Sequence, residues 1–306
     1  IVKMNNFTKG IMILFGSILA WSSLEVTGSY IFAEGAGPVT LLSTRFLIAT
    51  ILFGVTILFQ KYRTGENLFL VEKQDIKRFL TNGAFLAVHL ITYWFGWEYL
   101  DPNIPVIYGI FYFYPFVLAL VAVYLYGEKF STKRKIAVGL GTVGSLFAIE
   151  FLPTFSTEAL TTSGVLLCVV AVAAWVGYLL VGQSIMKKYK PLTIVFYDFL
   201  QVFVYTSLLQ SPATTISQLT THNLLAILYI AIVASYIAYL CYWTAIKYIG
   251  ASNAGVGELC FGSFFAVIIA YFFLDTAPSV YQLLGLGLLS GGIFLIYKEK
   301  QTAYDQ

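Results

Sequence analysis

The chain has 306 residues, of which 59% are hydrophobic and only 11% are charged. A soluble domain carries about 25% charged residues, so this composition excludes a water-soluble protein and predicts one that lies within a lipid bilayer. The formal net charge of +3 is too small to indicate a nucleic-acid partner. The three cysteines lie singly inside apolar runs, without the spacing of metal ligands, and we predict no metal and no cofactor.

Long apolar runs follow one another along the chain. A helix needs about 20 apolar residues to cross the hydrocarbon of a membrane. Ten runs come near that length, at 8–32, 38–60, 77–99, 104–125, 134–151, 162–184, 191–210, 223–245, 252–274 and 279–297. The sequence therefore predicts ten transmembrane helices.

The basic residues alternate with these runs. If the N-terminus is cytoplasmic, nearly every lysine and arginine falls in an inside segment, between Lys3 and Lys9 at one end of the chain and Lys298 and Lys300 at the other. The outside segments carry Glu34, Asp101, Glu150, Glu158, His222 and Asp275 instead. Lysine and arginine mark cytoplasmic loops, so we predict that both ends of the chain are cytoplasmic.

The two halves of the sequence are related. The matched pairs, in order, are Ala20-Trp21 with Ala174-Trp175, Pro38 with Pro191, Arg45 with Asp198, Tyr93-Trp94 with Tyr242-Trp243, and Gly139-Leu140-Gly141 with Gly285-Leu286-Gly287. Each half has an odd number of spans, so the second half inserts upside down relative to the first. We predict an all-α integral membrane protein with repeats 1–151 and 152–306, arranged as a 5+5 inverted repeat around a central cavity.

Several motifs in this order resemble the EamA-like branch of the drug/metabolite transporter superfamily. They are Ala20-Trp21-Ser22-Ser23, Pro38 with Arg45-Phe46-Leu47, Tyr112-Phe113-Tyr114-Pro115, Gly127-Glu128-Lys129 and Trp175-Val176-Gly177-Tyr178. Asp275 stands where that family usually has a glutamate, and Gly262 replaces a frequent proline. The resemblance implies an inverted fold whose third, fourth, eighth and ninth helices act as gates, and substrates such as amino acids, other metabolites or drugs.

Ionisable groups deep in the predicted helices are candidates for substrate binding or proton coupling, because burying them costs at least a few kcal/mol. Three stand out: Glu25, His89 and Glu258. Each has a structural alternative. Glu25 would form an ion pair with Arg45, His89 would hydrogen-bond a neighbouring tyrosine, and Glu258 would bond the backbone of another helix. For Arg45 and Asp198 we predict structural roles.

Aromatic residues make up 17% of the chain, more than interfacial belts require. We predict that part of them surround the solute, where they would enclose an amphipathic molecule or hold a cation by cation–π attraction. The candidate cavity aromatics are Trp21, Trp175, Tyr178, Tyr93, Tyr108, Tyr112 and Tyr239.

The stretch from Gly139 to Gly144 spells the dinucleotide fingerprint G-x-G-x-x-G, but it lies inside a predicted membrane helix, where small residues instead allow close packing. We expect that packing between the fifth and tenth helices, which are also the candidate surface of a homodimer. No nucleophile elbow or histidine-containing metal motif is present, so we do not predict an enzyme.

The function predicted from these observations is secondary active transport of small organic solutes across the cytoplasmic membrane, taken to be a bacterial one, by alternating access. Amino acids or amino-acid-like metabolites are the leading substrate class, and organic cations, drugs or quaternary amines are the alternative. Outside transport, the rival is a membrane receptor or scaffold. The predicted partners are the solute and the lipid bilayer.

Overall fold

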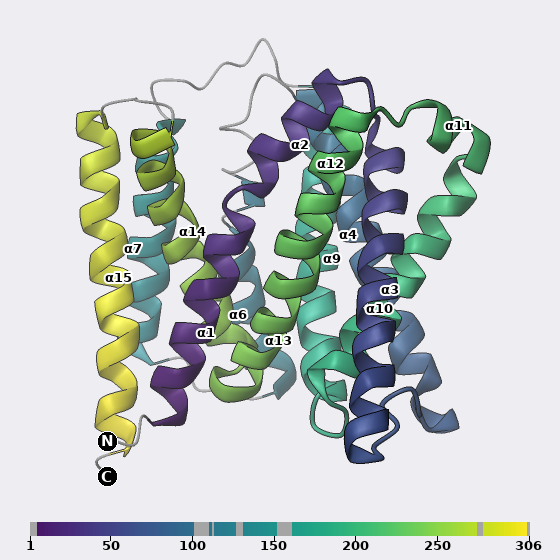
Figure 1. Cartoon of the computed structure of the whole chain (residues 1–306). Coiled ribbons are helices and arrows are strands. Elements are labelled where there is room, and N and C mark those ends of the chain that lie inside the picture. The colour runs from purple at the N-terminus through teal and green to yellow at the C-terminus, as the bar shows by residue number, and fades with distance from the viewer. Residues whose placement is uncertain are drawn as a thin grey trace.

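The computed structural model describes residues 5–100, 110–111, 113–126, 131–151, 161–273 and 278–304. Within these ranges the regular elements are all helices, and most of them run up and down through one bundle (Figure 1). Helix α1 begins and α15 ends at the same, lower end of that view.

The first half of the chain forms helices close to the predicted spans. The second span begins at Pro38, in the first helical position, and ends before Gly65, which has a left-handed conformation (φ 73°). Proline at a helix start and glycine after a helix end are typical boundaries. The first span is interrupted, since one helix ends at Trp21 and the next begins at Leu24. The elements are α1 (Asn6–Trp21), α2 (Leu24–Ala33), α3 (Pro38–Thr64), η1 (Lys73–Asp75), α4 (Ile76–Leu100), α6 (Tyr114–Tyr126) and α7 (Thr132–Ala148).

The second half repeats this series with local differences. Its eighth span contains a π-helical segment, η2 (Ala231–Ile237), between two α-helical parts. The remaining elements are α9 (Thr162–Ile185), α10 (Pro191–Leu209), α11 (Pro212–Ser217), α12 (Thr221–Ile230), α13 (Ala238–Ile249), α14 (Ala251–Phe273) and α15 (Val280–Tyr304).

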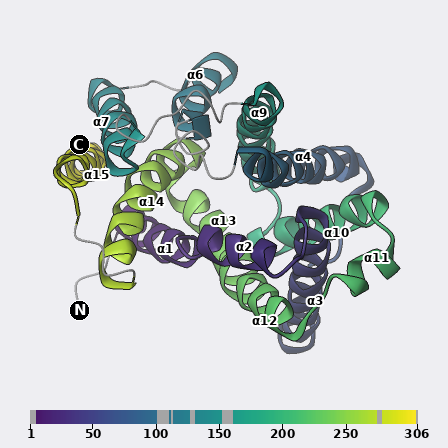
Figure 2. The same cartoon turned by 90° about the horizontal axis from the view of Figure 1, so that it is seen from above.

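The helix pairs follow the symmetry of an inverted repeat. The most extensive contacts join α4 with α9, α7 with α15, α1 with α13, and α3 with α10. In the numbering of the predicted spans these are 3 with 6, 5 with 10, 1 with 8, and 2 with 7. Exchanging the two halves turns each pair into itself or into another of the four. Figure 2 shows α7 and α15 at one end of the bundle and α3, α4, α10 and α11 toward the other.

A glycine–tryptophan contact recurs at equivalent places in the two halves. A Cβ on Gly28 would lie 2.4 Å from Trp94, and a Cβ on Gly182 would lie 2.0 Å from Trp243. Both indoles are fully buried. Each glycine follows its matched tryptophan, Trp21 or Trp175, by seven residues. Only glycine lets the two backbones accept an indole this close, so this shared contact supports the alignment of the halves.

The glycine-rich fifth and tenth spans pack on each other within the chain. A Cβ on Gly285 would lie 2.7 Å from the carbonyl oxygen of Gly144 and 2.6 Å from the amide nitrogen of Ala148. Small residues thus bring the backbones of α7 and α15 together, as predicted from the glycine pattern. A homodimer through the same helices stays a prediction.

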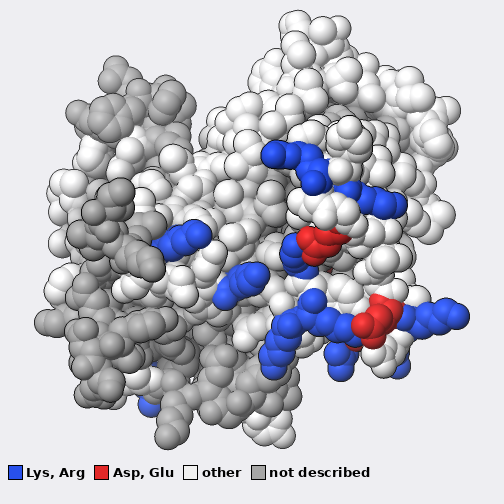
Figure 3. Space-filling view, turned by 60° about the horizontal axis from the view of Figure 1, so that its bottom comes forward, with Lys and Arg blue, Asp and Glu red and all other residues white. Residues whose placement is uncertain are grey.

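The outer surface is apolar and the charges gather at one end. Among the described residues, five segments are long and apolar enough to cross a membrane: 6–33, 38–64, 162–185, 191–209 and 221–249. Large apolar side chains such as Leu58, Phe59 and Leu208 are exposed on this surface. Figure 3 shows lysine and arginine side chains collected over the lower end of the bundle, with acidic residues among them. The chain is therefore an integral membrane protein.

Candidate functional site

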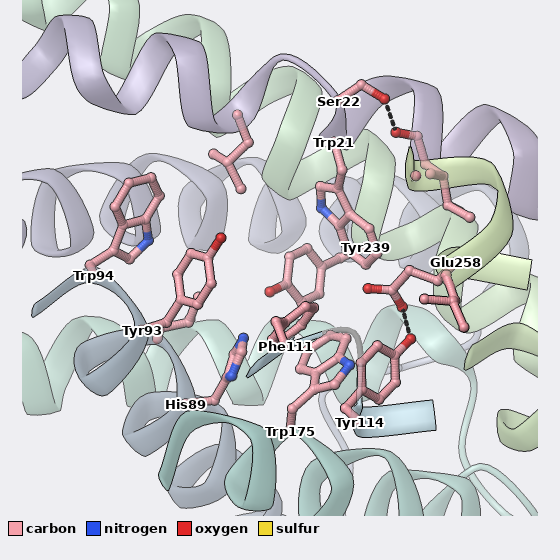
Figure 4. A pocket seen from close by; sticks show the side chains of 15 residues that line it. Trp21, Ser22, His89, Tyr93, Trp94, Phe111, Tyr114, Trp175, Tyr239 and Glu258 are labelled. Atoms are coloured by element: carbon pink, nitrogen blue, oxygen red, sulfur yellow. Dashed lines mark hydrogen bonds between the residues drawn. The ribbon is translucent and has the colours of Figure 1, made fainter. Parts of the chain in front are cut away.

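A cavity lies where the two halves meet (Figure 4). The volume of this cavity that is accessible to water is about 140 Å³. Its walls come from α1, α2, α4, α6, α9, α13 and α14 and from the break between α1 and α2, so both repeats contribute. The lining residues are Ile18, Trp21, Ser22, Leu24, His89, Leu90, Tyr93, Trp94, Phe111, Tyr114, Trp175, Tyr239, Glu258, Leu259 and Gly262.

The break in the first span places Trp21 in the cavity. Trp21 is the last residue of α1, and its Nε1 donates a hydrogen bond to the carbonyl oxygen of Ala234 at 2.7 Å. Ser22, the next residue, turns its hydroxyl back to the carbonyl oxygen of Ile18 at 2.8 Å. The indole N–H of Trp21 thus bonds the eighth span, and the ring of Trp21 lines the cavity.

The π-helical segment accepts side chains from other helices. Arg45, fully buried on α3, donates from Nε to Ser235 Oγ at 2.5 Å and from Nη2 to the carbonyl oxygen of Ala234 at 3.4 Å. On α1, Ser17 donates to the carbonyl oxygen of Ala238 at 2.8 Å. A π-helical turn widens the helix, and side chains of neighbouring helices satisfy carbonyl groups at such irregular places within a membrane. Arg45 therefore holds α3 against the eighth span.

Asp198, on α10, is the equivalent of Arg45 in the second half of the chain. The Nδ2 atom of Asn82 on α4 donates to both of its carboxylate oxygens, at 3.0 and 2.9 Å. Nearby on α9, the Tyr178 hydroxyl accepts a hydrogen bond from Nε1 of Trp243 at 2.7 Å. Thus Arg45 joins span 2 to span 8, and Asp198 joins span 7 to span 3. The register that aligns these two residues in the sequence also relates their contacts in space.

Glu258 is the acidic residue of the cavity lining. It lies on α14, and its Oε2 accepts a hydrogen bond of 2.6 Å from the hydroxyl of Tyr114 on α6. The Tyr114 ring passes close to Gly255, one turn before Glu258, where a Cβ would lie 3.4 Å from the ring. The carboxylate is therefore oriented by a tyrosine of the other repeat while remaining on the cavity wall.

Aromatic rings of both repeats meet beside this carboxylate. The repeat-equivalent indoles Trp21 and Trp175 lie edge to face, with their centroids 6.2 Å apart. Tyr239 packs edge-on against Trp21 at 5.1 Å, and Tyr114 lies 6.4 Å from Trp175. Such edge-to-face contacts are favourable beyond the area they bury. The rings form one continuous wall across the middle of the bundle.

His89 is fixed in one orientation on α4. Its Nδ1 lies 2.9 Å from the carbonyl oxygen of Ala171 on α9, and its ring lies 4.8 Å from that of Trp175. A carbonyl oxygen only accepts, so Nδ1 must carry the hydrogen. In the neutral imidazole, Nε2 is then the acceptor. The tyrosine partner expected from the sequence is replaced here by the backbone of the neighbouring helix.

The structure places the other predicted residues as follows. Tyr93 lines the cavity beside His89, whereas Tyr178 is fully buried and packs behind Trp175 at 5.3 Å. Tyr108, Tyr112 and the side chain of Glu25 lie outside the described residues.

The cavity also contains residues that were not among the predicted site residues, including Trp94, Phe111, Tyr114 and Ser22. Tyr114 belongs to the Tyr112–Pro115 motif of the fourth predicted span. Pairing that motif with Glu258 on the repeat-related ninth span could have identified Tyr114 as a site residue. In the described part of the chain, no three or more His, Cys, Asp or Glu side chains are grouped to hold a metal ion.

A helical membrane protein with two inverted halves and a polar and aromatic cavity between them has the architecture of a transporter. Comparison with known families agrees. The chain belongs to the EamA-like transporter family, which matches it twice, over residues 8–149 and 162–298. The protein is thus a membrane transporter of the drug/metabolite type.

Solved structures share this fold. One, a crystal structure described simply as that of a protein, covers 95% of this chain and 97% of its own, with a TM-score of 0.75 at 17% sequence identity. At that identity the likeness concerns the fold alone. The comparison with curated protein sequences gives no significant match.

Proposed function

We propose that this protein is a secondary active transporter that moves small organic solutes across the cytoplasmic membrane by alternating access, and that the solute binds in the cavity between the repeats. The observation that carries the proposal is the cavity wall itself, where Glu258 of one repeat is held by Tyr114 of the other beside the paired indoles Trp21 and Trp175. A membrane scaffold has no need of a carboxylate at this depth, which costs at least a few kcal/mol to bury.

The proposed orientation has both ends of the chain in the cytoplasm. The basic side chains in Figure 3 gather at the end of the bundle where α1 begins and α15 ends. The opposite end carries the α2–α3 and α10–α12 connections, with Glu34 and His222. A basic end is the cytoplasmic end by the positive-inside rule.

Differences between the halves support alternating access. The first span is broken after Trp21, while the equivalent sixth span is the continuous helix α9. The eighth span has its π-helical segment, while the equivalent third span is the regular helix α4. Inverted repeats change access by moving one repeat against the other around a fixed site. We propose that these local shapes are exchanged between the halves when the cavity opens to the other side.

Amino acids or amino-acid-like metabolites are the proposed first substrate class. Glu258 would bind the ammonium group of such a zwitterion. The carboxylate of the bound amino acid would face the start of α2, where Ser22 and Leu24 line the cavity. The N-terminal end of a half-helix is partly positive and favours a carboxylate, an arrangement that broken helices provide in other transporters.

Organic cations are the second candidate class, and one observation favours them. The described lining residues include many aromatic rings and one carboxylate, and they include neither lysine nor arginine. Such a wall attracts a cation through the faces of its rings as well as through the carboxylate.

The test is solute flux into proteoliposomes that contain the purified protein. Radiolabelled neutral amino acids and a set of organic cations are supplied with and without a pH gradient. We expect saturable uptake of at least one class, and we expect Glu258→Gln to abolish it while the variant keeps its helical circular dichroism. If no solute of either class moves, the transport proposal fails and a receptor or scaffold takes its place.

A further inference from the structure

This inference rests on the proposed function and concerns the size of the solute. We infer that Gly262 is a specificity-determining residue, whose missing side chain leaves room for the apolar group of the solute. Gly262 lies on α14, and its backbone lines the cavity. The solutes selected in this way are amines or amino acids with one apolar substituent, up to about the size of a single ring.

Helix packing does not explain this glycine. A Cβ on Gly262 would have one described heavy atom within 4 Å, Cγ2 of Ile18 at 3.8 Å, which is an ordinary van der Waals distance. Gly257 on the same helix differs, because a Cβ there would lie 2.4 Å from Leu14. Gly257 therefore allows a neighbouring helix to approach, whereas an alanine would fit at Gly262.

Backbone geometry does not require the glycine either. Among the described residues, the glycines with a positive φ are Gly35, Gly65 and Gly250, and Gly262 lies within the regular helix α14. Glycine inside a helix is less favourable than alanine, because it loses more backbone freedom on folding. What the glycine provides at this position is space on the side of the cavity.

The space beside Gly262 belongs to an apolar part of the cavity wall. Ile18 of α1 faces it, and Leu259, three residues earlier on the same face of α14, also lines the cavity. Glu258, the proposed partner of the solute's ammonium group, precedes Gly262 by about one helical turn, or about 6 Å along the axis. A solute with its amino group at Glu258 reaches Gly262 with an apolar group at that distance, as leucine or phenylalanine has and alanine lacks.

The volume of the cavity indicates how large that apolar group is. The cavity has about 140 Å³, and an engineered apolar cavity of about 150 Å³ in another protein holds benzene. In Figure 4 the rings of Tyr239 and Trp175 lie between Trp94 on the left and Glu258 on the right. The group held there is therefore about as large as one ring, and a methyl group added at Gly262 would obstruct the largest solutes first.

Two matched series of probes test the inference, by the shift each compound causes in the melting temperature of the purified protein. The zwitterions are alanine, leucine, phenylalanine and tryptophan. The amines are ethylamine, isopentylamine, phenethylamine and tryptamine, which lack only the carboxylate. In Gly262→Ala we expect phenylalanine or phenethylamine to bind at least about tenfold more weakly, because the added methyl overpacks the site. Alanine or ethylamine should bind equally well or up to about fourfold more tightly, since the methyl fills space that they leave empty.

Two further variants show whether the effect is steric. Gly287→Ala on α15 makes the same substitution outside the cavity lining, with no described atom within 4 Å of the new Cβ, and should bind every probe as the wild type does. Ile18→Ala removes the side chain that faces Gly262 and should increase the affinity for the two-ring probes, tryptophan or tryptamine. Combined with Gly262→Ala, it should restore the binding of the one-ring probes.

Circular dichroism and the melting temperature without ligand show whether the variants fold. If Gly262→Ala does not fold, Ile18→Ala tests the inference by itself. The inference is overturned by equal weakening of all probes in folded Gly262→Ala, by unchanged binding of the one-ring probes, by no gain for two-ring probes in Ile18→Ala, or by no binding of either series. A glycine that acted as a hinge would instead lower kcat for every solute and leave the size preference unchanged.

The failure of the proposed function is distinct from these outcomes. Binding with the expected dependence on size, without any flux in proteoliposomes, refutes transport and leaves the inference in place. Flux that Gly262→Ala reduces without regard to the size of the solute refutes only the inference.

Discussion

The contact between Gly182 and Trp243 allows a sharp test of the inverted-repeat packing. In Gly182→Ala the new Cβ would lie 2.0 Å from an indole carbon that is fully buried. An ordinary carbon–carbon contact is about 3.5 Å, so the ring has to move by about 1.5 Å. Overpacking of this kind costs about 1–3 kcal/mol.

The movement also affects a hydrogen bond. Trp243 Nε1 donates to the Tyr178 hydroxyl at 2.7 Å, and a bond between helices in a membrane is worth about 0.6 kcal/mol, up to about 1.7. The expected loss of unfolding free energy is therefore about 2–4 kcal/mol. Because Tyr178 packs against Trp175 of the cavity at 5.3 Å, we also expect weaker solute binding.

The assay is unfolding of the purified variants in detergent micelles, followed by tryptophan fluorescence and circular dichroism. Gly16→Ala is the control, since nothing lies within 4 Å of that Cβ, and we expect it to be neutral or slightly stabilising. Gly28→Ala tests the equivalent contact with Trp94, whose Nε1 has no hydrogen-bond partner among the described residues, so it should cost about 1 kcal/mol less. Wild-type stability of Gly182→Ala, or equal behaviour of all three variants, would refute the reasoning.

The remaining predictions concern single contacts. Tyr114→Phe removes the 2.6 Å bond to Glu258, and we expect a loss of about 1 kcal/mol in unfolding free energy with a higher KM for solute in proteoliposomes; an unchanged KM contradicts the role of Tyr114. Arg45→Lys keeps the charge but not the fork that reaches the eighth span, and we expect slower transport and a lower melting temperature, so wild-type behaviour of both would count against it. At the basic end, a hydrogen bond from Lys188 holds the pKa of Asp75 below its ordinary 3.8. The carboxylates of Asp75 and Glu72 in turn raise the pKa of Lys188 above its ordinary 10.5. The ion pair of Asp75 and Lys188 stabilises the fold fully between pH 3.8 and pH 10.5, the ordinary pKa values of the two groups. Its effect is lost as the pH falls through the lowered pKa of Asp75, or rises through the raised pKa of Lys188. The melting temperature of Lys188→Met should therefore lie below that of the wild type at neutral pH and approach it as the pH falls below 3.8, and a constant difference across that range would contradict the assignment.

The helices and the relation between the two halves could both be predicted from the sequence. Crossing a bilayer requires long apolar runs, because every backbone group must be bonded within its own segment. The expected spans therefore coincide closely with α3, α9 and α10. The alignment of Trp21 with Trp175 was equally readable, because duplication leaves residues in a common order, and the structure brings the two indoles together.

The site was readable only in part. Depth in a membrane helix marked Glu258 and His89 as functional candidates, and both line the cavity. Their partners were not predictable, because a sequence gives no distance between helices. Tyr114 and the carbonyl oxygen of Ala171 lie 144 and 82 positions from them along the chain.

Composition, apolar spacing and the order of repeated residues by themselves determined that this chain is a helical membrane protein with two inverted halves. These features depend on the bilayer and on short-range backbone bonding, which act on each segment separately. The tertiary structure alone decided that the first span breaks after Trp21, that the eighth widens to accept Arg45, and that His89 bonds the carbonyl oxygen of Ala171. Those outcomes depend on which helix lies alongside, and hydrogen bonds between helices select them.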